Sequence, residues 1–315
     1  MSTVINLRPS PSPTDLRDLV GNTPLVRLKR IPSGVVADSV EIWCKLEWFN
    51  PGGSVKDRAA ASIISDAERR GLLRPGVRLL DASSGNTGIA YAWLAASRGY
   101  PLTLCMPANA STERKRILSA HGVDLILTDP LEGSDGAIRR AQQLHNEHPN
   151  EYVYLDQYSN DANWKAHYNS TGPEIYNDTQ GRITDFVATL GTSGTFMGTA
   201  RYLKRQRPSI RCHTVQPDSP FHGLEGMKHM ESALVPPIFQ PEGLVDSDIG
   251  APTEDSYALV RQLAVDEGLL VGISAGSAVW AALEVGKTLD SGVIVAILAD
   301  GGSRYLSESH LWETP

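Results

Sequence analysis

The sequence has few cysteines and no long apolar run. Three cysteines, Cys44, Cys105 and Cys212, are spread over 315 residues. Cys44 and Cys105 lie in apolar strand-like runs, so we expect buried free thiols, and no Cys/His spacing resembles a zinc site. No apolar run reaches the roughly 18 residues of a membrane span, and the N-terminus lacks the layout of a secretory signal. We therefore expect a cytoplasmic protein without a metal site.

An excess of positive charge is also missing. The net charge is −7, which disfavours nucleic acid and anionic membrane as partners. The hydrophobic share of 41% is that of an ordinary globular protein with enough material for a core. The length favours one large domain or two moderate ones.

Two familiar phosphate-binding motifs are absent. A Walker loop requires glycine five residues before Gly-Lys-Ser/Thr. The chain has "GKT" at 286–288, but position 281 is Ala281. The turn "GTSGTFMG" (191–198) lacks the Gly-x-Gly-x-x-Gly spacing of dinucleotide-binding proteins. These absences exclude a P-loop NTPase and disfavour a dinucleotide-binding enzyme.

Short apolar runs alternate with helix-like stretches along most of the chain. Such alternation with buried strands is typical of α/β architecture with mostly parallel sheets. The segment 217–250 breaks the pattern, and a long irregular segment in a compact domain is often a lid or binding loop. The predicted strands are 41–46, 77–82, 102–106, 123–127, 152–155, 185–190, 211–216, 269–273 and 293–298. The predicted helices include 55–71, 87–99, 111–122 and 253–268.

Three glycine-rich turns each connect a predicted strand to a helix: "SSGNTG" (83–88), "GTSGT" (191–195) and "GISAGSA" (272–278). In parallel α/β sheets, ligands bind beyond the carboxyl ends of strands, where helix N-termini offer free amide donors to anions. "GTSGT" suits a phosphate because hydroxyls flank its glycines. "SSGNTG" suits a carboxylate. The glycines of a single turn of this kind usually serve only to make the backbone turn tight. Three such turns in one chain indicate a binding site.

Lys56, in "NPGGSVKDR" (50–58), is placed oddly for a cation. It stands at the predicted start of a helix, with Ser54 as the expected cap, and there it faces the positive end of the helix dipole. That position costs about 0.3–1 kcal/mol. Lys56 either turns into solvent or is neutral part of the time, as an amine nucleophile must be.

A hydrolase reading of the third turn is formally complete. Gly272–Gly276 matches the Gly-x-Ser-x-Gly nucleophile elbow around Ser274. Asp300 and His310 follow in the order Ser, acid, His. This reading leaves Lys56 and the other two turns without roles. An aldehyde cofactor with a phosphate arm uses all of them, since such a cofactor needs a lysine, a phosphate cradle and a group at its ring nitrogen.

These motifs, in this order, resemble the pyridoxal-phosphate enzymes of the cysteine synthase and cystathionine β-synthase family. "GNTPLVRL" (21–28), "DQYSNDANWKAHYNSTGPEI" (156–175) and "DGGSRYLS" (300–307) are similar as well. The resemblance covers nearly the whole chain after the N-terminal arm. It implies fold type II, as in the tryptophan synthase β subunit: two α/β domains with mostly parallel sheets and the cofactor, pyridoxal 5'-phosphate, between them. The smaller domain would span 42–154 and the larger 1–41 plus 155–315.

The resemblance also implies a role for individual residues. Lys56 would hold the cofactor and act as acid and base, Asn86 would bond the ring hydroxyl, and Ser274 would face the pyridine nitrogen. A neutral serine there favours β-elimination over competing paths. The residues implied for the phosphate are Gly191, Thr192, Ser193, Gly194 and Thr195. Those implied for the substrate carboxylate are Ser83, Ser84, Asn86, Thr87 and Gln157.

The implied reaction is β-replacement on O-acetyl-L-serine, or on O-phospho-L-serine, by sulfide or another sulfur donor. It passes through a bound aminoacrylate and gives L-cysteine. The family also implies a homodimer, and it leaves open a sulfur-carrier protein or a serine acetyltransferase as partner.

The irregular segment resembles the B form of cysteine synthase more than the A form, because it lacks the glycine-rich pattern of the A form and carries basic residues. Lys228 and His229 fall on the basic positions. They are either solvated or face the site, where they would favour an anionic group such as thiosulfate, a thiocarboxylate or a phosphate.

Three other functions stay open at this point. A stand-alone cystathionine β-synthase, using serine and homocysteine, shares the "DQY" and "AHY" motifs. A serine hydrolase would use Ser274. A non-catalytic scaffold would be expected to lack Lys56 or the asparagine loop "SSGNTG" (83–88), and the chain has both.

Overall fold

The structure is a computed structural model that describes residues 15–83 and 85–312. Its strands are β1 (Leu25–Arg27), β2 (Val40–Leu46), β3 (Arg78–Ala82), β4 (Leu102–Pro107), β5 (Asp124–Thr128), β6 (Tyr152–Tyr154), β7 (Asp185–Thr189), β8 (Arg211–Pro217), β9 (Ser247–Ala251) and β10 (Gly292–Leu298). They form a six-stranded sheet of order β1-β2-β10-β7-β8-β9 and a four-stranded sheet of order β5-β4-β3-β6. All pairings between these strands are parallel except the antiparallel β1–β2.

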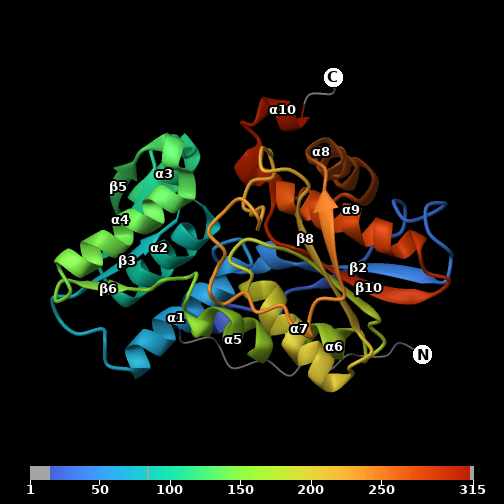
Figure 1. Cartoon of the computed structure of the whole chain (residues 1–315), viewed down its shortest axis with the longest axis horizontal. Helices are drawn as coiled ribbons and strands as arrows, with labels where there is room; N and C mark the ends of the chain where they lie inside the picture. The colour runs from blue at the N-terminus through green and yellow to red at the C-terminus, as the bar shows by residue number, and fades with distance from the viewer. Residues whose placement is uncertain (1–14, 84, 313–315) are drawn as a thin grey trace, which may run out of the picture.

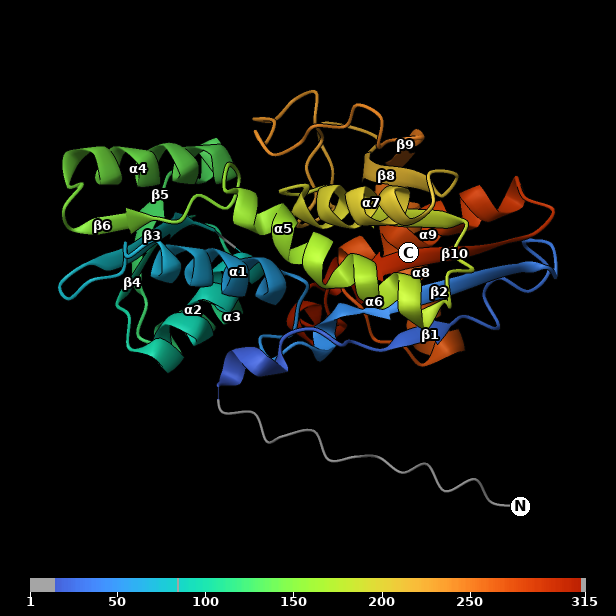
Figure 2. The same ribbon diagram turned by 90° about the horizontal axis from the view of Figure 1, so that it is seen from below.

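Helices cover both faces of each sheet (Figures 1 and 2). The α-helices are α1 (Lys56–Arg69), α2 (Asn86–Arg98), α3 (Thr112–Ala120), α4 (Gly133–Glu147), α5 (Asp161–Asn169), α6 (Thr171–Asp178), α7 (Gly194–Gln206), α8 (Thr253–Gln262), α9 (Ile273–Lys287) and α10 (Ser309–Trp312). Short helical turns are η1 (Leu16–Leu19), η2 (Glu47–Phe49), η3 (Pro130–Glu132), η4 (Leu263–Glu267) and η5 (Gly302–Tyr305). On the four-stranded sheet, α1, α2 and α3 share a core on one face and α4 packs on the other. On the six-stranded sheet, α8 and α9 cover one face, and α6 and α7 the other.

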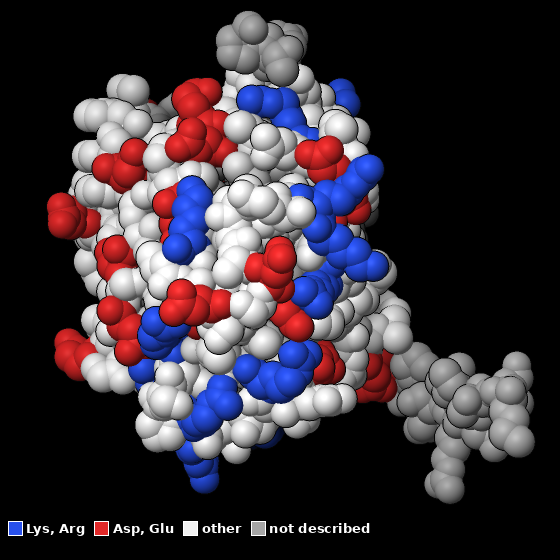
Figure 3. Space-filling model, turned by 90° about the vertical axis from the view of Figure 1, so that its right-hand side faces the viewer, with Lys and Arg blue, Asp and Glu red and all other residues white. Residues whose placement is uncertain are grey.

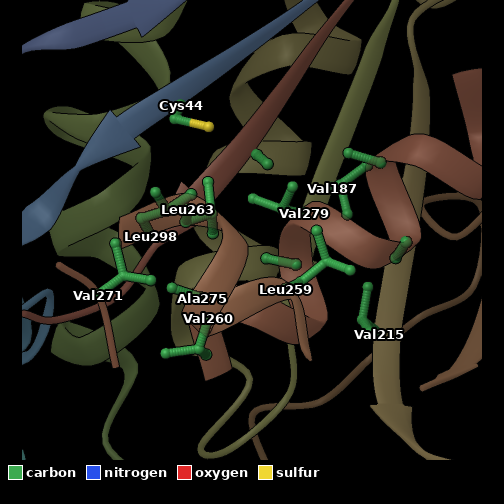
Figure 4. Close-up of a cluster of buried hydrophobic side chains, with 14 of the residues drawn as sticks. Cys44, Val187, Val215, Leu259, Val260, Leu263, Val271, Ala275, Val279 and Leu298 are labelled. Atoms are coloured by element: carbon green, nitrogen blue, oxygen red, sulfur yellow. The ribbon is translucent and has the colours of Figure 1, made fainter. Parts of the chain in front are cut away.

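Strand alternation explains the division of the cores. Leu79 and Leu80 are neighbours on β3, yet they pack into clusters on opposite faces because successive side chains of a strand point to opposite sides. The largest cluster fills the space between the six-stranded sheet and helices α8 and α9 (Figure 4). The predicted α/β class with two mostly parallel sheets is confirmed.

Most predicted strands occur within one residue of their predicted ends. The run 269–273 is the exception: it is not a strand, because Val271 makes only an isolated bridge to Gly301 and α9 already begins at Ile273. A short buried apolar run has the same composition in either state. Strands β1 and β9 were not predicted. Both lie at sheet edges, are mostly not buried and lack a continuous apolar run. β9 also shortens the irregular segment predicted at 217–250 to 218–246.

The domain division at 42–154 stays a prediction. The four-stranded sheet is built from strands between residues 78 and 154. Strand β2 begins at Val40, near the predicted start of the smaller domain, but it pairs with β10 in the six-stranded sheet. The chain therefore passes from one sheet to the other after β2, through the segment that contains Lys56.

The surface gives no sign of a polyanion-binding face on the side shown in Figure 3, where acidic and basic side chains are interspersed. Across residues 15–83 and 85–312, no helix is long and apolar enough to cross a bilayer. The three cysteines are buried and free, as expected for Cys44 and Cys105.

Close packing of α7 against α5 generates a testable prediction. Gly198 lies inside α7, and a Cβ there would overlap the backbone oxygen of Trp164. Alanine should favour the isolated helix by about 1 kcal/mol, but overpacking costs about 1–3 kcal/mol. We expect Gly198→Ala to lower the free energy of unfolding in urea. Gln206→Ala, at the exposed end of α7, is the control and should change it by less than about 0.5 kcal/mol. A stabilised Gly198→Ala variant would show that the helices can separate at no cost.

Candidate active site

One cavity lies at the carboxyl ends of strands from both sheets. Strand β3 ends at Ala82 and β7 ends at Thr189, and the turns that follow them face each other across about 190 Å³ of space. Lys56 also lines this cavity. The carboxyl ends of parallel strands are the usual place for ligands in such sheets, so the topology brings together segments that the sequence separates.

The cavity contains many, though not all, of the predicted site residues. Those that line it are Lys56, Ser83, Asn86, Thr87, Gln157, Gly191, Thr192 and Lys228. Ser193, Gly194 and Thr195 follow directly into α7 and do not line it themselves. Ser274 and His229 are not part of the lining. Ser84 lies outside the described residues.

Lys56 is the first residue of α1, as predicted, but Ser54 is not the cap residue. The cap position belongs to Val55, which offers no side-chain bond, while the Ser54 Oγ accepts a 3.3 Å bond from the Lys56 N–H. Asp57 instead fixes the preceding turn, since its carboxylate accepts bonds from the Gly52 N–H at 2.6 Å and the Trp93 indole at 3.0 Å. Helix α1 therefore starts from a turn held by a tertiary contact.

The Lys56 amine has no hydrogen bond or ion pair to any described residue. Part of the residue is open to the cavity, yet burial lowers the pKa of Lys56, while the charges of Asp300 and Glu47 act in the opposite direction. Desolvation disfavours the protonated form of a lysine. The site thus favours a neutral amine, which is the form that a nucleophile or a general base requires.

The start of α7 forms a cradle for an anion. The first N–H groups of a helix have no partner within it, and α7 begins at Gly194 in the turn after β7. The Ser193 hydroxyl is buried without a hydrogen-bond partner among the described residues. A Cβ on Gly194 would overlap the Asn163 amide. Free donors, an unpaired hydroxyl and a glycine that cannot be enlarged are features of a phosphate site.

The cradle contains no charged side chain next to its hydroxyls. Asn163 Nδ2 donates to the Thr192 hydroxyl at 3.0 Å, and the Thr195 hydroxyl lies 3.4 Å from His167 Nε2. Burial, reinforced by the charges of Arg58 and Lys56, holds the pKa of His167 well below 6.5. This imidazole is therefore neutral at pH 7, and an anion would be bound by amide and hydroxyl donors.

On the opposite side of the cavity, the Ser83 and Thr87 hydroxyls of the asparagine loop form hydrogen bonds with its backbone and with Gln157. The Ser83 Oγ accepts the Gly88 N–H at 2.9 Å, which fixes the start of α2. The Thr87 hydroxyl donates to Gln157 Oε1 at 2.7 Å, and Gln157 Nε2 donates to the Ala82 carbonyl at 2.7 Å. Backbone donors at this helix start suit a carboxylate.

Ser274 lies at the start of α9, largely buried, and its hydroxyl has no partner among the described residues. The hydrolase constellation is not assembled around it. The Asp300 carboxylate accepts bonds from Asn86 and Tyr305. His310 is exposed on α10 beside Glu308. With no described contact joining Ser274, Asp300 and His310, the nucleophile-elbow match is a coincidence of sequence.

The irregular segment 218–246 forms one wall of the cavity through Glu225, Gly226, Met227 and Lys228. Lys228 Nζ lies 3.2 Å from Asp135 on α4 and 5.2 Å from the Tyr158 ring centroid. His229, by contrast, contacts the Ser232 hydroxyl at 2.9 Å and is only partly exposed, outside the cavity lining. Of the two basic residues, the structure brings only Lys228 to the cavity.

Several residues of the site were not predicted from the sequence. Arg114 on α3 pairs with Glu225 across the cavity and lies over the Tyr305 ring. No pattern in its helix marked it. Asn163 and Tyr305 lie in the motifs "DQYSNDANWKAHYNSTGPEI" and "DGGSRYLS", which were noted as similar without roles for these two residues.

Comparison with known proteins identifies the family. Residues 16–300 match the family model described as pyridoxal-phosphate dependent enzyme. The chain belongs to the family of pyridoxal-phosphate dependent enzymes.

Relatives of this family cover nearly the whole chain. The chain is 54% identical over 293 residues to a cysteine synthase of Aquifex aeolicus, covering 92% of this chain and 89% of that protein. It is 44% identical over 292 residues to cysteine synthase B of Pseudomonas aeruginosa, covering 93% and 95%. The crystal structure of the Entamoeba histolytica cysteine synthase (OASS) superposes with a TM-score of 0.92 at 32% identity, covering 100% of this chain and 94% of that one.

The residues present fit pyridoxal phosphate, the cofactor of this family. The start of α7 offers free donors and the unpaired Ser193 hydroxyl for a phosphate. Lys56 offers an unpaired amine in the cavity that Gly191 and Thr192, the residues preceding this cradle, also line.

Burial of the Lys56 amine should affect the stability of the fold. We expect Lys56→Met to stabilise the cofactor-free protein at pH 7 by on the order of 1 kcal/mol, because it removes a group whose charged form burial disfavours. Between the lowered folded pKa of Lys56 and the ordinary value of 10.5, the unfolded chain binds a proton that the folded chain does not. Wild-type stability therefore rises with pH in that window, and the advantage of the variant should shrink.

Urea unfolding of both proteins at pH 7 and pH 10 measures this difference. Lys29→Met, an exposed substitution, is the control and should show no pH-dependent gain. An advantage of Lys56→Met that is equal at both pH values would contradict a lowered lysine pKa.

Proposed function

We propose that this protein is a cysteine synthase that replaces the β-acetoxy group of O-acetyl-L-serine with sulfur and releases L-cysteine. The observation that carries the proposal is the unpaired Lys56 amine in the cavity that Gly191 and Thr192 also line, because these two residues lead directly into the anion cradle at the start of α7. The family supplies the cofactor, pyridoxal phosphate. The relatives named as cysteine synthases support the substrate.

Different residues in and around the cavity bind the cofactor ring, the cofactor phosphate and the substrate carboxylate. Lys56 would hold the cofactor through its amine while no amino acid is bound, the Asn86 amide would bond the ring hydroxyl, and Ser274 would face the ring nitrogen. The phosphate is bound by Gly191, Thr192, Ser193, Gly194 and Thr195. The substrate carboxylate is bound by Ser83, Ser84, Asn86, Thr87 and Gln157. The bound cofactor supplies an electron sink for the α-carbon of the amino acid.

Lys56 performs the proton transfers. Its neutral Nζ takes the α-proton, which lets the acetate leave from the β-carbon, and it returns a proton after sulfur has added. A lysine with a lowered pKa suits both steps, because general acid–base catalysis is most efficient when the pKa lies near the working pH. Backbone and hydroxyl donors hold the carboxylate so that the α-carbon stays next to Nζ.

Lys228 sets the preference for charged ligands. Its ammonium is buried at the cavity wall and paired with a single carboxylate, Asp135. An anionic leaving group or sulfur donor, such as phosphate or thiosulfate, would compete with Asp135 for this charge. We therefore include O-phospho-L-serine as a second substrate. His229 has no part in this preference.

We also propose a cytoplasmic homodimer whose smaller domain, 42–154, closes over the substrate carboxylate. Closing domains commonly sequester substrate in this way.

The visible spectrum and cysteine formation test the function together. The purified protein incubated with pyridoxal phosphate should be yellow, change its visible band with O-acetylserine, and form cysteine when sulfide is added. Lys56→Ala should lose the band shift and at least about a thousandfold in turnover, while Lys29→Ala should match the wild type.

Other outcomes favour other functions. A protein that responds only to serine plus homocysteine is a cystathionine β-synthase. One that stays colourless, and whose ester cleavage is lost in Ser274→Ala but not in Lys56→Ala, is a hydrolase. A colourless protein with neither activity is a scaffold.

Lys228→Met tests substrate charge. We expect kcat/KM for O-phosphoserine to fall about tenfold, as for the loss of a partly buried charge pair, and kcat/KM for O-acetylserine to change less than about threefold. His229→Asn, outside the cavity, is the matched control. Equal losses for both substrates in Lys228→Met would mean that the lysine only secures the wall of the cavity.

A further inference from the structure

Two charged side chains hold Asn86 from opposite ends of its amide. Asn86 Nδ2 donates to Asp300 Oδ2 at 2.7 Å. Arg304 Nη1 donates to Asn86 Oδ1. Asn86 begins α2 beside the four-stranded sheet, whereas Asp300 and Arg304 follow β10 of the six-stranded sheet. The contact therefore joins the two halves of the molecule at the cavity.

The chemistry of the two partners fixes which way the amide points. An arginine can only donate hydrogen bonds, and an ionised carboxylate can only accept them. The oxygen of Asn86 must therefore face Arg304, and the nitrogen must face Asp300. An asparagine between two hydroxyls could be turned over at little cost. Turning Asn86 over would set two donors against each other at one end and two acceptors at the other.

Both partners are themselves held in place. Asp300 is 1% exposed, and its Oδ2 also accepts the Tyr305 hydroxyl at 2.7 Å. The Gly272 N–H donates to the Asp300 carbonyl at 3.1 Å. Arg304 uses its other terminal nitrogen, Nη2, to donate to the Gly52 carbonyl. One guanidinium thus contacts both Asn86 and the turn that precedes Lys56.

Gly53 shows how closely this contact is built. Its φ is +78°, and a Cβ there would press on the Arg304 guanidinium. A side chain at position 53 would therefore be strained and would also displace the arginine. The turn leading to Lys56 and the start of α2 are therefore both held by the short helix η5, through Arg304.

We propose that Asp300 and Arg304 are positioning residues that fix the amide orientation of Asn86, so that one N–H of Nδ2 remains as a donor to the cofactor's ring oxygen. The proposal rests on the function proposed above. A fixed donor favours the ionised form of the ring oxygen, since hydrogen bonding to a charged form stabilises it. An amide free to turn over would lose part of this preference, because its oxygen would repel the ionised form.

Three variants of the cofactor-loaded protein test this arrangement. Asp300→Asn replaces the acceptor by a group that can donate or accept, which removes the constraint at the nitrogen end of the Asn86 amide and leaves the one from Arg304. Arg304→Lys keeps the charge but gives up the planar fork that contacts two acceptors at once. Ser303→Ala, in the same short helix and exposed, is the control.

The readout is the pH titration of the visible band, together with the dissociation constant of pyridoxal phosphate measured by dialysis. In Asp300→Asn we expect the midpoint of the titration to rise by about one pH unit and the dissociation constant to increase about tenfold. Arg304→Lys should shift both quantities in the same direction by a smaller factor. Ser303→Ala should match the wild type in both.

A merely structural role gives a different result. In that case both variants lower the thermal stability of the cofactor-free protein and weaken cofactor binding, but the titration midpoint stays at the wild-type value, and the proposal is wrong. If Asp300→Asn does not fold, Arg304→Lys decides the question by the same midpoint. A wild type that binds no pyridoxal phosphate would instead overturn the proposed function.

Discussion

The site is arranged around an amine that must be kept out of water without an ion pair. Lys56 stands at the positive end of α1, where both the helix dipole and desolvation oppose its charge. An adjacent carboxylate would stabilise the ammonium and remove the reactivity. The negative charges of Asp300 and Glu47 act on Lys56, and each of these carboxylates accepts hydrogen bonds from other donors.

Glu47 shows how the structure meets this constraint. Arg58, two residues after Lys56, donates from Nε to Glu47 at 2.7 Å and from Nη1 to Glu174 at 2.7 Å. The Arg58 and Glu47 side chains are 1% and 0% exposed. Removing one member of a buried pair leaves an unpaired charge, which typically costs about 3–5 kcal/mol. The pair therefore anchors the first turn of α1. It also engages the Glu47 carboxylate, which could otherwise stabilise the charged form of Lys56.

The anion cradle at the start of α7 likewise has no charged side chain next to its hydroxyls and is built from neutral groups. Next to the Gly191–Thr195 turn, burial holds His167 neutral and Asn163 supplies an amide. Close contact between α5 and α7 is possible because Gly194 and Gly198 lack a Cβ. Helix packing, more than charge, shapes this end of the cavity, while the cations Arg114 and Lys228 lie at the wall formed with segment 218–246.

The sequence alone determined the alternation of strands and helices, the start of α1 at Lys56 and the glycine-rich turns, because these features depend on neighbours within a few residues. From them, and from the family they resemble, came the cofactor class and the cavity-lining residues Ser83, Thr87 and Gln157. One error has the same origin, because the apolar run 269–273 was assigned to a strand by composition. Composition also could not tell which of the adjacent residues Lys228 and His229 lines the cavity.

The tertiary structure decided the contacts between distant segments. Asn86 lies 214 residues from Asp300 and 218 from Arg304, and Arg114 lies 111 residues from Glu225. No periodicity connects positions so far apart. They meet because the carboxyl ends of strands from two sheets face one cavity, and that arrangement exists only once both sheets have packed against their helices.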